Sequence, residues 1–237
     1  MQAVILAGGL ATRMQPLTEH TPKSLLPVAG RPFIAWQLEK LEACGFSEIV
    51  VCLGYLGELI RDFVGDGSRF DLSVQYSEDG PKLLGTAGAL RHALPLLAPE
   101  FVVTYGDSYL PFDYTAPLAD LRGHSEALGS MSVFLNQGRW DESNTEVEGD
   151  LVKRYVRGSR DLAVDHIDYG ATALRRETIA DLLPEVPTPL ETVLTDLALS
   201  QKLRAFRVSE RFYEIGSAAG LADLERMLAS AEPGVKS

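Results

Sequence analysis

Apolar and polar positions along the first half of the chain follow two different periods. Short apolar runs predict buried strands, and they lie at residues 3–6, 48–53, 72–76 and 101–105. Longer segments with apolar residues at helical spacing lie between or after them, at residues 32–44, 56–64 and 85–97. Strands and helices that alternate in this way predict right-handed crossovers. The expected fold class is therefore α/β, with a three-layer, Rossmann-like, mostly parallel but mixed sheet that carries helices on both faces.

The pattern changes after Leu135. Residues 140–156 are polar and interrupted by Gly149, and no Pro- or Ser-rich linker separates the two halves. The second half is expected to hold a strand, two helices, a pair of short strands and a last helix, at residues 165–174, 176–183, 190–201, 206–215 and 218–228. We therefore expect one domain, residues 1–237, in which a first half (1–135) is followed by a lobe (136–230) and a frayed tail (231–237).

Composition narrows the class of protein. The chain has 237 residues, of which 46% are hydrophobic, so a full core can form. Its net charge of -11 argues against a nucleic-acid partner, which requires a dense Lys and Arg surface. No apolar run approaches the roughly 20 residues that cross a bilayer, and the first residues lack the basic region of a signal peptide. Cys44 and Cys52 stand in apolar contexts and are expected to be reduced, so we expect a cytoplasmic protein.

Candidate chemistry concentrates directly after the first predicted strand. Gly8 and Gly9 let backbone N–H groups approach a ligand closely because neither residue carries a Cβ. Arg13 offers a planar fork suited to phosphate oxygens, and Lys23 offers a mobile point charge. A cationic, glycine-rich loop on an acidic protein indicates an anionic small molecule. Further glycines and Asp107 also fall at the carboxyl ends of predicted strands, where ligands bind in sheets of this kind.

The segment GGLATRMQPLTEHTPKSLLP resembles the signature of the sugar-1-phosphate nucleotidyltransferases, also called nucleotide-sugar pyrophosphorylases. The matching positions are Gly8, Gly9, Ala11, Thr12, Arg13, Pro16, Thr18, Pro22, Lys23 and Pro27. Looser matches follow in the order typical of that family, at residues 84–88, 105–108, 167–170 and 213–217. The resemblance implies a fold of the nucleotide-diphospho-sugar transferase type, in which the first half binds a nucleotide and the small lobe binds a sugar.

The resemblance also implies a reaction, in which a sugar 1-phosphate attacks the α-phosphorus of a nucleoside triphosphate and pyrophosphate leaves. Arg13 would hold the pyrophosphate and Lys23 would span the two phosphates, while Asp107 and Glu214 would hold Mg²⁺ through hard oxygen ligands. The expected nucleotide-binding residues are Leu6, Ala7, Gly8, Gly9, Thr12, Gly85, Thr86 and Gly88. The expected residues for the sugar phosphate are Lys153, Arg157, Asp168 and Gly170. The partners would be these two small-molecule substrates, and a homo-oligomer is compatible with the sequence.

The sequence departs from the family at two places. Many members carry a Glu-Lys pair whose lysine grips the sugar phosphate; residues 152–158 contain no such pair, and either Lys153 or Arg157 could replace it. Glu214 stands where many members have Asp, so its contact with a metal would be looser or water-mediated. The base is a further open choice. Residues 84–88 resemble guanylyltransferases that act on mannose- or heptose-type phosphates, which favours GTP over UTP.

Other interpretations remain open at this point. A metal-dependent glycosyltransferase usually shows D-x-D, where this chain has Gly106-Asp107-Ser108. A regulatory subunit would bind a nucleotide sugar without making one. Asp107 could merely cap a turn, Thr86 could cap a helix, and Asp168 could be a buried structural acid. For Trp140 we favour packing of the lobe over a platform for a sugar.

Overall fold

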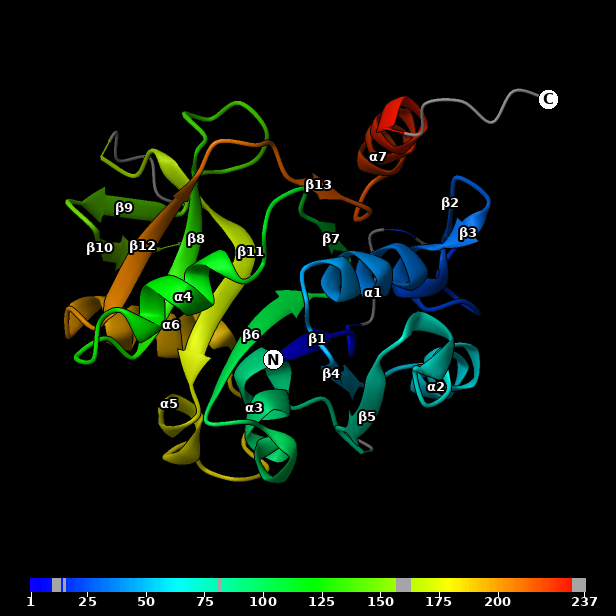
Figure 1. Ribbon diagram of the computed structural model, residues 1–237, viewed down its shortest axis with the longest axis horizontal. Coiled ribbons are helices and arrows are strands. Elements are labelled where there is room, and N and C mark those ends of the chain that lie inside the picture. The colour runs from blue at the N-terminus through cyan, green and yellow to red at the C-terminus, as the bar shows by residue number, and fades with distance from the viewer. Residues whose placement is uncertain (10–13, 15, 81, 157–162, 232–237) are drawn as a thin grey trace.

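Strands from both halves form one sheet. The computed structural model describes residues 1–9, 14, 16–80, 82–156 and 163–231. Within them lies a nine-stranded sheet in the order β5-β4-β1-β6-β11-β8-β12-β10-β9 (Figure 1). Its strands are β1 (Gln2–Leu6), β4 (Glu48–Leu53), β5 (Ser73–Glu78), β6 (Glu100–Tyr105), β8 (Gly129–Leu135), β9 (Thr145–Glu148), β10 (Leu151–Tyr155), β11 (His166–Arg175) and β12 (Leu203–Val208). β5, β4, β1 and β6 pair in parallel, whereas β11 is antiparallel to β6 and β8, which confirms the mixed α/β sheet.

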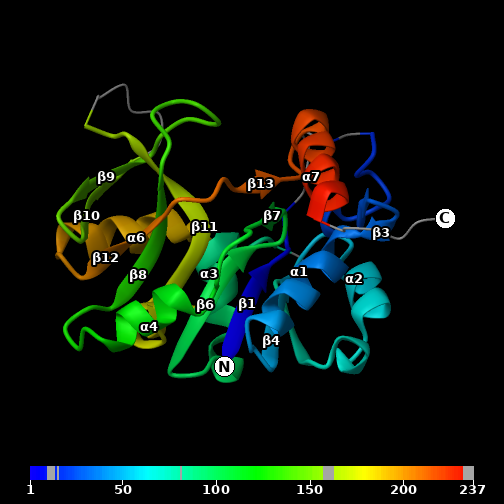
Figure 2. The same ribbon diagram turned by 45° about the horizontal axis from the view of Figure 1, so that its top comes forward.

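The sheet is buried on both faces. In β1, Ala3 and Ile5 belong to one core cluster, while Val4 and Leu6 belong to another, because successive side chains of a strand point to opposite faces. The first cluster includes side chains of α1 (Phe33–Ala43), α2 (Gly57–Val64) and α4 (Ala116–Arg122). The second includes side chains of α3 (Gly85–His92), α5 (Glu177–Ala180) and α6 (Leu190–Leu199). Figure 2 shows α1 and α4 in front of the sheet and α3 and α6 behind it, which makes three layers.

Some helices end elsewhere than the pattern predicted. The segment 85–97 is α-helical only to His92, and Leu94–Leu96 form a 3-10 turn. Pro95 explains this end, since it lacks the N–H that a continuing α-helix needs and its ring clashes with the preceding turn. The segment 176–183 holds only the single turn α5. The last helix, α7 (Ala218–Ala231), is three residues longer at its end than predicted, and residues 232–237 of the expected tail lie outside the described residues.

The structure contains elements that the pattern did not predict, namely α4 and β8 at the end of the first half and β9 and β10 in the second. β9 and β10 form a hairpin around Gly149, whose φ of 59° suits glycine. β9 also pairs with β11 through Thr145 and His166, so five strands close on one another at that end of the sheet (Figure 1). Both halves share one sheet, because β11 of the second half pairs with β6 and β8 of the first, and β12 pairs with β8. Their division into nucleotide and sugar halves stays a prediction.

Two small sheets lie beside the main one. β7 (Ser108–Tyr109) pairs with β13 (Tyr213–Glu214), and β2 (Pro27–Val28) pairs with β3 (Arg31–Pro32). α7 packs close to both sheets, and its Leu224 and Leu228 share a small core with Val28 and Phe33 (Figure 1). This packing places α7 next to residues 27–33 of the first half. None of the described helices has the length and apolar character needed to cross a membrane.

Candidate active site

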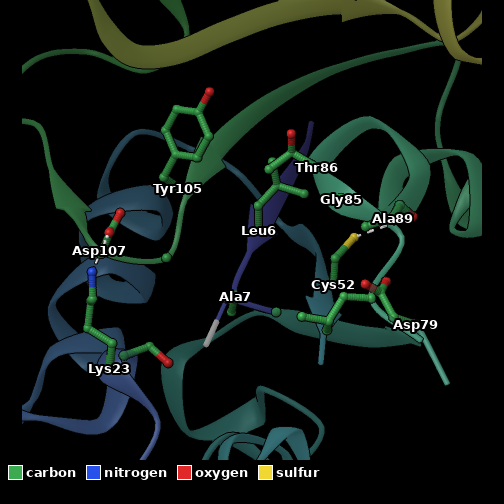
Figure 3. A pocket seen from close by; sticks show the side chains of 15 residues that line it. Leu6, Ala7, Lys23, Cys52, Asp79, Gly85, Thr86, Ala89, Tyr105 and Asp107 are labelled. Carbon is green, nitrogen blue, oxygen red and sulfur yellow. Dashed lines mark hydrogen bonds and ion pairs between the residues drawn. The ribbon is translucent and has the colours of Figure 1, made fainter. Parts of the chain in front are cut away.

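A pocket of about 270 Å³ opens at the carboxyl ends of β1 and β6 (Figure 3). This is where a parallel sheet is expected to bind its ligand. The walls come from the loop after β1, the 3-10 turn Lys23–Leu25, the end of β4, the segment between β5 and α3, and the end of β6. The lining residues are Leu6, Ala7, Gly8, Gly9, Lys23, Ser24, Cys52, Asp79, Leu83, Gly85, Thr86, Ala89, Tyr105, Gly106 and Asp107. Eight of the sequence-predicted site residues therefore meet in one cavity.

The charged groups gather at one rim of this pocket. Lys23 Nζ lies 2.9 Å from Asp107 Oδ2, and the two side chains are 14% and 35% exposed (Figure 3). β13 places Glu214 opposite Ser108, and the Ile215 N–H donates to the Asp107 carbonyl at 2.9 Å. A Cβ added to Gly216 would collide with Glu214 Oε2 and lie 3.3 Å from Lys23 Nζ. The Lys23 ammonium and both predicted metal ligands are thus neighbours, although each of the two carboxylates lies more than 80 residues from Lys23 in sequence.

Glu214 also has a local structural role. Its carboxylate accepts hydrogen bonds from the Gly216 N–H and, at 3.0 Å, from the Ser217 hydroxyl. These bonds hold the turn that leads into α7. Each carboxylate oxygen can accept more than one bond, so the side chain keeps capacity for another ligand.

The carboxylates at this rim fit a magnesium ion. Among the described residues, no group of three or more His, Cys, Asp and Glu side chains could hold a metal alone. Mg²⁺ is usually bound by one or two carboxylates together with substrate phosphates and water, and Asp107 and Glu214 would supply two carboxylates of this kind.

The two glycines after β1 have different surroundings. A Cβ on Gly8 would lie 3.2 Å from the Gly54 nitrogen, and a Cβ on Gly54 would lie 2.5 Å from the Gly8 carbonyl oxygen. Gly8 is therefore packed against the end of β4. A Cβ on Gly9 would meet nothing within 4 Å, so its lack of a side chain leaves open space beside the pocket. Gly54 was not predicted, although a glycine directly after a buried strand is a signal for close backbone approach.

The loop before α3 is fastened to the second half of the chain. A Cβ on Gly85, whose φ is 71°, would lie 2.8 Å from the Thr188 carbonyl oxygen. The same oxygen accepts the N–H groups of Ala87 and Gly88 at 2.9 and 3.0 Å. Gly85 lines the pocket as expected. Gly88 does not line it and packs against residues 186–188 instead, so its predicted contact with a nucleotide stays a prediction.

Thr86 caps a helix, but a different one from the helix that the sequence suggested. Its hydroxyl accepts the N–H of Leu190 at 2.6 Å and thereby caps α6 rather than its own helix. The residue also lines the pocket. A contact between Thr86 and a base edge is compatible with this position and stays a prediction.

Asp79 is a pocket residue that sequence reasoning missed. It is 8% exposed, and its Oδ2 accepts the Leu84 N–H at 3.0 Å. Burial raises the pKa of this carboxyl, while the bond from Leu84 opposes the shift. The signal was available, since Asp79 follows β5 as Asp107 follows β6. Cys52 lies beside it, and burial, helped by the charge of Asp79, raises the pKa of that thiol to about 12, which leaves the thiol unreactive.

Asp168 and Gly170, two of the residues predicted to bind the sugar phosphate, both lie on β11. The Asp168 carboxylate accepts the Tyr155 hydroxyl at 3.2 Å and the Gly170 N–H at 2.9 Å. Between Asp168 and Thr172 the pairing of β11 with β8 is shifted, and Gly170 there has a φ of 101°. A Cβ on Gly170 would lie 3.5 Å from Ser108 Oγ, so this bulge borders the Asp107 turn.

Lys153 lies away from the pocket lining. Its side chain is 51% exposed and pairs with Glu148 at 2.7 Å, and the hydrogen bond that it donates to this carboxylate raises the pKa of Lys153. Nothing in this position favours it as a ligand of the sugar phosphate. Thr12, Arg13 and Arg157, the other predicted ligands of phosphate groups, lie outside the described residues.

The polar run at residues 140–144 now has a structural account. The Trp140 ring stacks on the Arg211 guanidinium at 3.8 Å, and Arg211 pairs with Asp223 of α7. The Asn144 side chain accepts the Asp168 N–H at 2.8 Å. The packing interpretation of Trp140 is consistent with this arrangement.

Comparison with known proteins adds independent information. A family model described as "Nucleotidyl transferase" matches residues 2–143. The chain is 33% identical over 220 residues to a D-glycero-alpha-D-manno-heptose 1-phosphate guanylyltransferase of Campylobacter jejuni, which covers 91% of this chain and 95% of the relative. It is 47% identical over 117 residues to an N-acetylmuramate alpha-1-phosphate uridylyltransferase of Neisseria meningitidis, over 49% of this chain and 51% of that one.

Several curated relatives are longer than the part that is matched, so that the chain spans about half of their length or less. Among solved structures, a putative glucose-1-phosphate thymidylyltransferase of Bacillus anthracis superposes with a TM-score of 0.83 at 19% identity. This match covers 99% of this chain and 97% of the other. At such low identity the likeness concerns the fold, and it confirms the expected nucleotide-diphospho-sugar transferase type.

Proposed function

The chain belongs to the nucleotidyl transferase family, among the sugar-1-phosphate nucleotidyltransferases, and from this we propose that it makes a nucleoside-diphosphate sugar and pyrophosphate from a nucleoside triphosphate and a sugar 1-phosphate. The observation that carries the proposal is the Lys23–Asp107 pair, with Glu214 beside it, at the rim of a glycine-walled pocket. A binding pocket with a convergent cation and carboxylates is suited to two anionic substrates and a metal ion.

The chemistry requires positioning and charge neutralisation rather than a covalent intermediate. The attacking oxygen of a sugar 1-phosphate is already anionic, so no general base is needed. Two polyanions must be held in line, and the charge that develops on the transferred phosphoryl group must be stabilised. Lys23 supplies one cation at the pocket rim, and Arg13 is proposed to supply another. The Gly8–Gly9 loop would offer backbone N–H groups to the phosphates.

Asp107 and Glu214 would hold Mg²⁺, which supplies charge neutralisation at the phosphates when it is bound. The ion pair with Asp107 keeps the Lys23 ammonium oriented before substrate arrives. A phosphate oxygen would then replace the carboxylate as the partner of Lys23.

We favour GTP as the nucleotide. The relative that covers nearly the whole chain is named a guanylyltransferase, whereas the uridylyltransferase matches about half of it. The buried Asp79 carboxyl also suits guanine, whose edge presents an N–H and an amino group as donors, whereas uracil presents a single N–H. Substitution of Asp79 by Asn is expected to narrow the preference for GTP over UTP.

The test is a pyrophosphate-release screen with Mg²⁺, four nucleoside triphosphates and a panel of sugar 1-phosphates. Lys23→Met and Asp107→Asn are expected to lower kcat/KM by about 100-fold or more with little change in melting temperature. Lys202→Met, which removes an exposed lysine, is the matched control and should behave as wild type. A folded wild type that is silent with every combination, yet still binds a nucleotide sugar, would contradict the proposal and indicate a regulatory subunit.

A further inference from the structure

A single buried amide stands on the apolar face of α1. Gln37 is 1% exposed and lies among the buried side chains of that helix, which include Ile34, Leu38 and Leu41. Glutamine is seldom buried to this degree unless its polar atoms have partners. The hydrogen bonds of this side chain therefore need an explanation.

Both amide hydrogens of Gln37 are used on one turn. Nε2 donates to the carbonyl of Tyr105 and to the carbonyl of Ser108, at 2.8 Å in each case. These two carbonyls flank Gly106 and Asp107, which come directly after β6. One side chain from α1 thus bridges the two ends of the turn that presents the Asp107 carboxylate to Lys23.

Packing alone does not account for an amide at this position. Among the described residues, Gln37 Oε1 is buried without a hydrogen-bond partner, which is unfavourable. An apolar side chain of similar volume would avoid that cost. Such a side chain would also lack the donor that bridges the Tyr105 and Ser108 carbonyls, so the contact with the turn is what a glutamine provides here.

The rest of the turn is held through its backbone. The Gly106 N–H donates to the Leu6 carbonyl and the Ile215 N–H donates to the Asp107 carbonyl, both at 2.9 Å. β1, β13 and α1 therefore support the turn from three different elements. Of these supports, Gln37 is the one made by a side chain, and it can be removed by substitution without changing the backbone sequence of the turn.

We propose that Gln37 is a positioning residue that fixes the Asp107 turn and thereby sets the affinity of this site for a divalent cation. The inference rests on the proposed role of Asp107 as a metal ligand, and it assigns a function to a residue that touches neither the metal nor a substrate. Groups that orient metal ligands from outside the coordination sphere typically change metal affinity by about 10- to 100-fold when they are replaced.

The experiment measures Mn²⁺ binding by the full chain, from the electron paramagnetic resonance signal of free Mn²⁺, with a thermal melt of each variant. Gln37→Met keeps the volume and removes both donors, and Gln37→Glu keeps the shape and replaces the donors by acceptors. Leu38→Met, at the neighbouring buried position of α1, is the control for altered packing. Asp107→Asn reports on the metal site itself.

The expected result is Mn²⁺ affinity lowered about 10-fold in Gln37→Met and at least as much in Gln37→Glu, with Leu38→Met equal to wild type. Wild-type affinity in Gln37→Met, together with loss of binding in Asp107→Asn, would overturn the role of Gln37 and leave the metal site intact. Equal losses in Gln37→Met and Leu38→Met would also overturn it, as a packing effect. Unchanged binding in Asp107→Asn, or no binding by the wild type, would instead refute the proposed metal site.

Discussion

Substitution of Gly54 by alanine, compared with substitution of Gly9, should separate two reasons for glycine at this site. One is close packing between two loops, and the other is close approach of a phosphate to the backbone. A Cβ at position 54 would lie 2.5 Å from the Gly8 carbonyl oxygen and 2.9 Å from the Gly8 Cα. Both atoms belong to the backbone, which cannot rotate away as a flexible side chain can. Neither glycine has a positive φ, so the cost comes from contact and not from the conformation of the new residue.

The magnitude follows from the size of the overlap. Real Cβ atoms essentially never approach closer than 3.0 Å, so the loop after β1 or the loop after β4 must move by several tenths of an ångström. Overpacking of this kind lowers the free energy of unfolding by about 1–3 kcal/mol. For a domain of this size, 1 kcal/mol corresponds to about 2–4 °C in melting temperature, so Gly54→Ala should melt about 2–12 °C below wild type.

The assay compares Gly54→Ala with Gly9→Ala, in the neighbouring loop after β1, where a Cβ would meet nothing within 4 Å. Thermal melts and the KM for nucleoside triphosphate are measured for each variant. Gly9→Ala should melt within about 1–2 °C of wild type. If the Gly9 N–H approaches a phosphate, the added methyl group should still raise KM. Gly54→Ala should change both quantities, because it displaces Gly8.

The reasoning would be refuted by a Gly54→Ala variant that melts with wild type and keeps its KM, since the contact between the two loops would then impose no constraint. A large loss of stability in Gly9→Ala would contradict the open surroundings of that residue. A KM for Gly9→Ala equal to that of wild type would mean that phosphates do not approach this glycine.

Two further predictions concern side chains of the pocket wall. Because the folded-state pKa of Asp79 is raised, its favourable contribution is complete below the unfolded pKa of about 3.9 and is lost as pH rises through the folded value. The melting temperature of Asp79→Asn should therefore be above that of wild type at neutral pH and equal to it near pH 4. A difference in melting temperature that grows as the pH falls would contradict this. Thr86→Val removes the acceptor for the Leu190 N–H and should lower the free energy of unfolding by about 1 kcal/mol, or the melting temperature by about 2–4 °C. Thr86→Ser keeps a hydroxyl and should keep the cap. If both variants melt at the wild-type temperature, the cap is ruled out.

The part of the site that could be predicted from sequence is the part built by strand ends. Lys23 and Asp107 lie 84 positions apart, yet each follows an apolar strand or a glycine-rich loop, and parallel strands bring such positions to one edge. The Gly8–Gly9 turn was predicted for the same reason. Here the local signal and the sheet topology point to the same place, so a motif is enough to locate the pocket.

The roles of the α3 loop could not be predicted, because they depend on a distant segment. Gly85 and Gly88 resemble a nucleotide-binding motif, but both face residues 186–188, and Thr188 supplies the carbonyl that caps the helix. The sequence carries no sign that these segments meet. The strand β8 was missed for a different reason, since Gly129, Ser130 and Ser132 interrupt its apolar residues and weaken the pattern of a buried strand.

The Asp107 turn also shows that the two halves do not act as separate units. Its backbone is supported by β1 and α1 of the first half and by Ile215 of the second, and Gly170 of β11 borders it next to Ser108. A chain cut after β8 would lose Glu214, the hydrogen bond from Ile215 to Asp107, and the strand β11 that pairs with β6. The first half carries the most recognisable motif, but the geometry that brings its lysine and carboxylate together with Glu214 depends on residues whose local sequence matches the family only loosely.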